Sequence, residues 1–184
     1  MTCGNIDFEC RRCRLSRGRT HVVAGSGPCK CRIAFIGEAP GREEDLKGIP
    51  FVGRGGKLLD STLKDLGVDR RRVFVCNLVK CRPPNNRRPR KDEIETCSQF
   101  LESELKTVKP KVICALGQTV ANNLLGNKVK MSELVRTAKR IDLVGLDVRF
   151  FVAYHPAACL YQRKNIASFK KSISASLRAA KMMK

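Results

Sequence analysis

Four short apolar runs, separated by helical patterns, restrict this chain most strongly to one class of fold. The runs are residues 33–36, 73–76, 112–116 and 150–153. Each is rich in branched or aromatic residues and has the length of a buried strand rather than of a helix. Strands that alternate with helices form a mostly parallel sheet that is covered on both faces. The pattern therefore predicts an α/β fold.

Apolar residues at three- and four-residue spacing predict a helix after each of these strands. The helical segments are 58–66, 94–108, 120–125 and 166–177. Gly67 and Gly126 follow two of them and are typical helix stops. Pro89 precedes the second segment and Pro110 follows it, as expected for residues that flank a helix. These four segments would supply the layers on the two faces of the sheet.

Each predicted strand ends in a residue that could carry function. These residues are Gly37, Asn77, Gly117 and His155. Parallel strands point their carboxyl ends at one edge of a sheet, and ligands bind in the crevice there. An Asn amide has both a donor and an acceptor, which suits the edge of a nucleobase. A lone histidine is more often structural than catalytic, so it is the strand-end position of His155 that suggests a role.

Two glycine-rich loops would border this crevice. Residues 37–45 form a tight, rigid turn that can present backbone amides and Glu38 to a ligand, although an ordinary turn has the same composition. In residues 50–57, Phe51 could stack on a base or could simply belong to the core. This second loop is not a nucleotide-binding Walker A loop, because Leu58 follows Lys57. An NTPase is therefore excluded.

The charge of the chain favours a polyanionic partner. Lys and Arg number 37 against 17 Asp and Glu, which gives a net charge of +20. Nucleic acid is the first candidate and an acidic membrane surface the second. Residues 80–90 hold five cations and three prolines, so this loop either grips phosphates or is a solvated charge run. We expect a soluble intracellular protein, because no apolar run reaches about 20 residues and no secretory signal is visible.

The chain contains ten cysteines, which is many for an intracellular protein. Intracellular thiols usually stay reduced, so metal or cluster binding outranks disulfides except in hyperthermophiles. Two sets of four fit a site, namely Cys10, Cys13, Cys81 and Cys97, and Cys10, Cys13, Cys29 and Cys31. The first could bind a [4Fe–4S] cluster or zinc, and the second has the spacing of a zinc ribbon. Composition does not choose between them.

Taken together, these motifs resemble the family 4 uracil-DNA glycosylases, the iron–sulfur type found in archaea and bacteria. The resemblance extends from Cys10 to about Arg163 and keeps the order and spacing of the family's motifs. It rests on residues 37–41 with Glu44 and Asp45, 50–53, Asn77 with 80–84, 155–158, and Cys10, Cys13, Cys81 and Cys97. It implies a three-layer α/β/α sandwich around a central four-stranded parallel sheet. It also implies one domain, residues 1–184, with a cluster-binding segment over about residues 1–30.

The resemblance implies a monofunctional DNA glycosylase of base excision repair. Such an enzyme hydrolyses the N-glycosidic bond of a flipped-out uracil and leaves an abasic site. The implied uracil-binding residues are Glu38, Ala39, Pro40, Glu44, Phe51, Asn77 and His155. Phe51 would stack on the ring, Asn77 would read its pairing edge, and Glu44 would crowd the C5 side and reject thymine. His155 would stabilise the charge that develops on O2.

The position that carries an aspartate for the attacking water in better-known uracil glycosylases is Ala39 here. Glu38 is the nearest replacement, and a backbone carbonyl would also serve. A second departure concerns the leucine that the family often wedges into the base stack. Its place is taken by Cys159, with Leu160 and Tyr161 next, so the wedge is not identified.

The resemblance also implies a cofactor and partners. A [4Fe–4S] cluster would be held by Cys10, Cys13, Cys81 and Cys97. This demotes the zinc ribbon, because Cys29 and Cys31 fall outside the family pattern. The expected DNA contacts are Arg82, Arg87, Arg88, Leu160 and Arg163.

The expected substrate is uracil-containing DNA, single- and double-stranded, with no membrane partner. We expect a monomer in the cytoplasm of an archaeon or bacterium, associated with the nucleoid, and a sliding clamp is a candidate partner. The competing hypothesis is a DNA-binding module that has a cluster but no activity. The complete set of Phe51, Asn77 and His155 argues against it.

Overall fold

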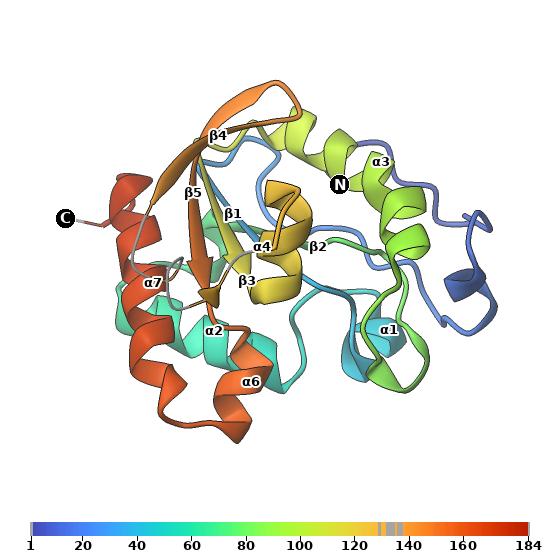
Figure 1. Ribbon diagram of the computed structural model, residues 1–184, viewed down its shortest axis with the longest axis horizontal. Coiled ribbons are helices and arrows are strands. Elements are labelled where there is room, and N and C mark those ends of the chain that lie inside the picture. Colours follow the sequence, from blue (N-terminus) through green and yellow to red (C-terminus); the bar gives the residue numbers. More distant parts are fainter. Residues whose placement is uncertain (1, 129, 132–134, 136–137, 184) are drawn as a thin grey trace.

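Five strands form a single sheet in the order β2-β1-β3-β5-β4 (Figure 1). The computed structural model describes residues 2–128, 130–131, 135 and 138–183. The strands are β1 (Ile33–Gly37), β2 (Phe74–Asn77), β3 (Val112–Leu116), β4 (Lys139–Leu143) and β5 (Leu146–Ala153). Four of them run parallel to one another, as the sequence predicts, namely β2, β1, β3 and β5. Their carboxyl ends therefore share one edge of the sheet.

β4 is an addition to the predicted four-stranded sheet. It pairs antiparallel with β5 through a two-residue turn at Val144 and Gly145, both of which have positive φ angles. Its side chains are exposed or half-buried, so it lacks the apolar run by which the other strands were found. The same hairpin lengthens the fourth predicted strand, which starts at Leu146 rather than at Phe150.

Helices cover both faces of the sheet. They are α1 (Arg42–Lys47), α2 (Arg54–Asp65), α3 (Lys91–Val108), α4 (Gln118–Leu125), α6 (Pro156–Tyr161) and α7 (Asn165–Ala179). The helices α2, α6 and α7 pack together in one layer, and α3 and α4 lie on the other side of the sheet (Figure 1). The described residues also include three short 3₁₀ turns, η1 (Arg14–Arg17), η2 (Arg70–Arg72) and η3 (Pro84–Asn86). The predicted three-layer α/β/α arrangement is confirmed.

The hydrophobic core has two parts. The larger lies between the sheet and its helices, where all residues of β1, β2 and β3 are buried. The smaller lies under the N-terminal segment and consists of Cys10, Leu15, Val22, Val79, Cys81, Cys97 and Phe100. Among the described residues, no helix combines the length and apolarity needed to cross a bilayer.

One disulfide joins Cys3 to Cys29. The sequence predicts reduced thiols, with disulfides only as an exception, so this bond departs from the prediction. It fastens the start of the chain to the segment that precedes β1. Cys31, two residues further on, is buried, and its thiol donates to the carbonyls of Ile33 and Arg72. Cys31 therefore packs at the start of the first strand.

Candidate active site

A crevice of about 440 Å³ opens beyond the carboxyl ends of β1, β2 and β5. The residues that the sequence singled out for a pocket all line it, namely Glu38, Ala39, Pro40, Glu44, Phe51, Asn77 and His155. They come from four separate stretches of chain, which meet because parallel strands end at a common edge. Sequence reasoning did not single out Arg54, Pro83 and Asn86, which also line the crevice.

Asn77 ends β2 directly beside Gly37, the last residue of β1. A β-carbon at Gly37 would overlap both Oδ1 of Asn77 and the ring of Phe51, so only glycine allows these groups to meet there. The Asn77 side chain is buried, at 3% exposure, yet makes no hydrogen bond with any residue that the structure describes. A buried amide without a partner is costly. Its donor and acceptor are therefore open to a ligand in the crevice.

Phe51 is held in a conformation that bulky residues rarely adopt. Its φ angle is 59°, in the left-handed region, where a non-glycine residue costs about 1–3 kcal/mol. The first turn of α2 lies directly against it, because a β-carbon on Gly56 would overlap the Phe51 carbonyl. The strained backbone of Phe51 thus places an aromatic ring beside Asn77.

Glu44 ties the two loops of the crevice together. One carboxylate oxygen accepts from the amide of Gly41 at 3.1 Å and the other from the amide of Gly53 at 2.7 Å. The first bond belongs to the N-terminal turn of α1, and the second reaches the loop that carries Phe51. Glu44 therefore fixes the spacing of the loops, besides lining the crevice as predicted.

His155 caps the N-terminus of α6 with its own ring. Its Nδ1 accepts a hydrogen bond from the amide of Ala157 at 3.2 Å, which leaves the proton of the neutral ring on Nε2. Burial lowers the pKa of His155 below its usual 6.5, and the nearby Glu44 opposes this only in part. The imidazole is therefore neutral at physiological pH, with an N–H donor available to the crevice. Gly117, at φ 104°, leaves room for it, because a β-carbon there would lie 3.2 Å from that of His155.

The residues predicted to contact DNA have different surroundings. Arg87 lines the crevice, but both of its Nη atoms donate to the buried carboxylate of Glu93, at 2.8 and 2.6 Å. Arg82 donates to Asn86 at 2.7 Å, and Arg88 is exposed. The ion pair gives Arg87 a structural partner that the sequence did not reveal.

The segment after His155 contains the residues that could enter the base stack as a wedge. Cys159, which stands in the family's leucine position, is fully buried in the core and faces away from solvent. Leu160 is half-buried, Arg163 is exposed, and neither lines the crevice. Tyr161, at the end of α6, is 82% exposed. Large exposed apolar groups are therefore found at the end of α6 and not at Cys159.

Cys10, Cys13, Cys81 and Cys97 line one small cavity, together with Val22 and Phe100. Its walls provide two donors to sulfur, since the Lys80 amide lies 3.3 Å from Cys97 Sγ and the Arg19 guanidinium 3.7 Å from Cys81 Sγ. Burial raises the pKa of Cys81 to about 12 and that of Cys97 to about 11. These thiols would keep their protons at neutral pH unless a bound metal displaced them.

The other four-cysteine set is not assembled. Cys29 is bonded to Cys3, and Cys31 packs at the start of β1, whereas Cys10 and Cys13 face Cys81 and Cys97. The zinc-ribbon alternative therefore loses two of its four ligands. Within the described part of the chain, no three side chains of the usual metal-binding types are grouped as ligands of one ion.

A buried ion pair behind the crevice was missed by sequence reasoning. Lys80 Nζ lies 2.6 Å from Glu104 Oε2 and donates to the backbone carbonyl of Asn77 at 2.8 Å. The other Glu104 oxygen accepts from the amide of Gly25 at 2.6 Å. A signal was available, because Glu104 falls on the apolar face of α3, beside Leu101 and Leu105. This pair supports the backbone of the residue whose amide enters the crevice.

Comparison with known proteins gives consistent matches over most of the chain. The model of the Uracil DNA glycosylase superfamily matches residues 24–178. The type-4 uracil-DNA glycosylase of Archaeoglobus fulgidus is 43% identical over 159 residues, which cover 84% of this chain and 80% of that protein. The type-4 uracil-DNA glycosylase of Thermotoga maritima is 42% identical over 158 residues, 85% of this chain and 81% of that protein. That of Saccharolobus solfataricus is 42% identical over 158 residues, which cover 83% and 73% respectively.

Proposed function

We infer the roles of the crevice residues from one premise, which is that this chain belongs to the uracil DNA glycosylase superfamily and, within it, to the type-4 uracil-DNA glycosylases. It is a DNA-repair hydrolase that breaks the N-glycosidic bond of uracil in DNA during base excision repair. One observation carries the assignment of its active site. The buried Asn77 amide has no partner among the described residues, and it shares a crevice with the Nε2–H of a neutral His155.

We propose that Asn77 and Phe51 recognise the flipped-out base. Phe51 stacks on the uracil ring, and the Asn77 amide accepts from N3–H and donates to O4. Cytosine presents the opposite pattern at these two atoms, so it would leave a buried amide mismatched. Glu44, fixed by its two backbone amides, crowds the C5 side against the methyl group of thymine. Backbone groups of Glu38, Ala39 and Pro40 complete the pocket.

We propose that His155 and Glu38 serve the chemical step. The bond from C1′ to N1 breaks with its electron pair on uracil, and negative charge builds on O2. The His155 Nε2–H donates to that oxygen as the charge develops. A water adds its oxygen to C1′, and the proton that it loses is taken up by the uracil anion, which leaves an abasic site and free uracil. We propose that Glu38 positions this water, because its carboxylate lines the crevice and makes no hydrogen bond with the described residues.

An Asn77→Ala variant is expected to excise uracil about 10²-fold more slowly than the wild type, because it loses two hydrogen bonds worth about 1.4 kcal/mol each. Single-turnover excision from uracil oligonucleotides, followed by alkaline cleavage of the abasic site, measures the rate. Asn123→Ala is the matched control, since Asn123 is an exposed residue of α4 and should keep the wild-type rate. The function would be refuted if the wild-type protein were inactive on single-stranded uracil DNA and also on double-stranded uracil DNA.

We propose that Cys10, Cys13, Cys81 and Cys97 hold a [4Fe–4S] cluster. In support, all four line one cavity, and none of the described residues that line it has a carboxylate or imidazole that would compete as a ligand. The two sulfur-directed donors from Lys80 and Arg19 would stabilise thiolates. The cluster would join the segment over about residues 1–30 to the loop before α3 and to α3 itself. Its contribution would be structural, as a cross-link between segments that share a small apolar core.

A Cys97→Ala variant is expected to lose the brown colour and the broad absorbance at about 400 nm that cysteine-bound iron gives. Protein purified without oxygen, with iron and sulfide measured per chain, provides the test. Cys114→Ala is the control, because Cys114 is buried in β3 away from this cavity and should keep the colour. A colourless wild-type protein with one zinc per chain would contradict the cluster.

We propose that the exposed end of α6, with Leu160 and Tyr161, enters the base stack, and that Arg82, Arg88 and Arg163 contact phosphates. Tyr161 is the better wedge of the two because of its exposure. Arg87 would contribute from its fixed position in the crevice wall. We propose further that the enzyme acts as a monomer in the cytoplasm, near the nucleoid, on single- and double-stranded DNA. A sliding clamp is a candidate partner.

A further inference from the structure

The segment from Cys10 to Arg19 contains five arginines and no acidic residue. We call Arg11, Arg12, Arg14 and Arg17 the arginine segment. It covers the cysteine-lined cavity from outside, since Cys13 and Ser16 face that cavity and all four arginines are exposed. None of these arginines belongs to the crevice. Their charge is therefore not accounted for by the active site.

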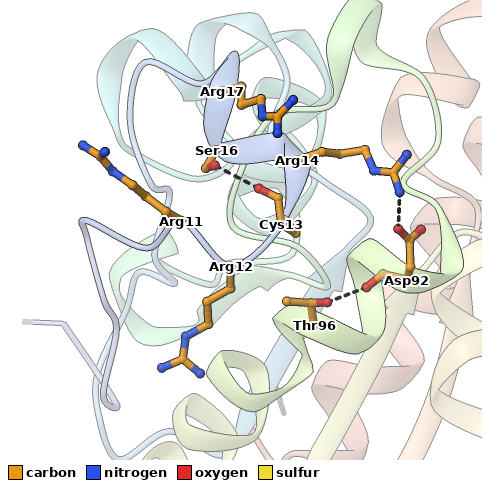
Figure 2. Close-up of a pocket in the computed structure, with 8 residues that line it drawn as sticks. All are labelled: Arg11, Arg12, Cys13, Arg14, Ser16, Arg17, Asp92 and Thr96. Carbon is orange, nitrogen blue, oxygen red and sulfur yellow. Dashed lines mark hydrogen bonds and ion pairs between the residues drawn. The ribbon is translucent and has the colours of Figure 1, made fainter.

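The arginine segment surrounds a hollow of about 540 Å³ beside the first turn of α3 (Figure 2). Its described lining is completed by Cys13, Ser16, Asp92 and Thr96. Asp92 is the acidic member of this lining, and it faces Arg14 at 2.7 Å. The hollow thus keeps a strong excess of positive charge on a surface open to solvent.

Two of the four arginines are held by neighbours and two are not. Arg14 pairs with Asp92, while Arg12 donates to Gln99 at 2.5 Å and lies over the ring of Phe100, 5.9 Å from its centroid. The side chains of Arg11 and Arg17 make no hydrogen bond or ion pair with any described residue, and both residues are exposed. Their guanidinium groups are available to an external anion without breaking an existing contact.

The directions of the side chains indicate what kind of anion fits. In Figure 2 the guanidinium groups of Arg14 and Arg17, from η1, and of Arg11 and Arg12, from the chain just before it, point in different directions and do not converge on one point. A small anion such as phosphate would be gripped by converging donors. Separated cations suit a chain of phosphates, each of which meets one or two arginines. The geometry therefore favours a nucleic-acid backbone over a single ion.

The arginine segment lies next to residues of the crevice wall at two places. On one side, the buried carboxylate of Glu93 is held by Arg87 of the crevice wall and lies 3.8 Å from the Nε of Arg14. On the other side, a second hollow is lined by Arg11, Arg17 and Glu9 and also by Gly48, the C-terminal cap of α1. The first turn of α1 lines the crevice. The arginine segment therefore adjoins the elements of the crevice wall at two places.

We propose that the arginine segment binds backbone phosphates of the DNA strand that flanks the uracil nucleotide. The proposal rests on the proposed function in one respect, namely that DNA is the polyanion present at the crevice. It adds a second contact region, on the segment that carries Cys10 and Cys13. The four-cysteine cavity thereby lies directly beneath a DNA-binding surface.

The test compares an Arg11→Gln/Arg17→Gln variant with a charge-matched control, Arg32→Gln/Lys111→Gln. Arg32 and Lys111 are exposed and directly precede β1 and β3, at the end of the sheet opposite the crevice. Binding to uracil-free duplex DNA is measured by fluorescence anisotropy over a series of salt concentrations. For the first variant, the slope of log K against log salt should fall in magnitude by about 2, or about 0.9 for each lost phosphate contact. The control should keep the wild-type slope.

A second measurement follows kcat/KM on uracil oligonucleotides whose flanks are lengthened stepwise. The deficit of the Arg11→Gln/Arg17→Gln variant should grow with flank length, while its circular dichroism spectrum and its denaturation midpoint stay at the wild-type values and so report an intact fold. Equal slopes for the variant and its control, with excision intact, would overturn this proposal alone. Because the binding measurement needs neither uracil nor turnover, a protein without glycosylase activity would still reveal the surface.

Discussion

A His155→Ala variant is expected to release uracil about 10²–10³-fold more slowly than the wild type, as is usual when one donor to a developing oxyanion is removed. The reason lies in the assignment of its ring nitrogens. Nδ1 is occupied by the Ala157 amide, so Nε2 carries the proton that faces the crevice. Single-turnover rates at saturating enzyme isolate this step from product release. The second histidine of the chain, His21, provides the control, because His21→Ala removes an imidazole outside the crevice and should keep the rate.

The pH profile distinguishes a neutral donor from a cationic one. Burial lowers the pKa of His155 below 6.5, so the neutral form that donates from Nε2 persists on the acid side of that value. The single-turnover rate should therefore stay level as the pH falls from 8 through 6.5. A rate that changes with an inflection at or above 6.5, and that loses this inflection in His155→Ala, would show that a protonated imidazole is the active form.

A Lys80→Met variant is expected to lose about 3–5 kcal/mol of folding free energy, which is the usual cost of removing one member of a buried ion pair. Lys80 and Glu104 are 1% and 0% exposed, so the remaining carboxylate would be left in the interior without a counter-ion. The carbonyl of Asn77 would also lose a donor. Chemical denaturation followed by circular dichroism measures the change.

The double variant Lys80→Met/Glu104→Gln separates the loss of charge balance from the loss of packing. Glutamine removes the buried charge and still offers an oxygen to the amide of Gly25. Most of the lost stability should therefore return. If the double variant were as unstable as Lys80→Met, the uncompensated carboxylate would not be the cause of the loss.

Much of the fold and of the crevice could be predicted because both depend on local patterns. Buried parallel strands are continuous apolar runs, so all four were found with ends correct to within a residue except for the start of β5. Asn77 and His155 followed from topology, because strand ends of a parallel sheet converge. β4 was missed because its exposed side chains carry no such pattern, and it exists through its pairing with β5.

The features that stayed hidden require two distant parts of the chain at once. The Cys3–Cys29 bond and the Lys80–Glu104 pair each join residues more than 20 positions apart. Helical periodicity places Glu104 on an apolar face but does not identify Lys80 as its partner. Arg87 is a different case, because its partner Glu93 is only six positions away, yet the sequence alone presents Arg87 as a free cation. The missing partner of the Asn77 amide could be recognised only once its surroundings were known.

Gly37 determines how the pocket responds to heat. The Asn77 amide and the Phe51 ring approach one another across the bare backbone of that residue, inside the hydrogen-bonded register of β1 and β2. Buried strands open late, whereas loops fluctuate far below the unfolding temperature. β2 lies at the edge of the sheet, but all its residues are buried, so the position of Asn77 should hold until this part of the sheet opens. Phe51 is carried by a loop instead. On heating, the reading of the pairing edge by Asn77 should consequently outlast stacking on Phe51.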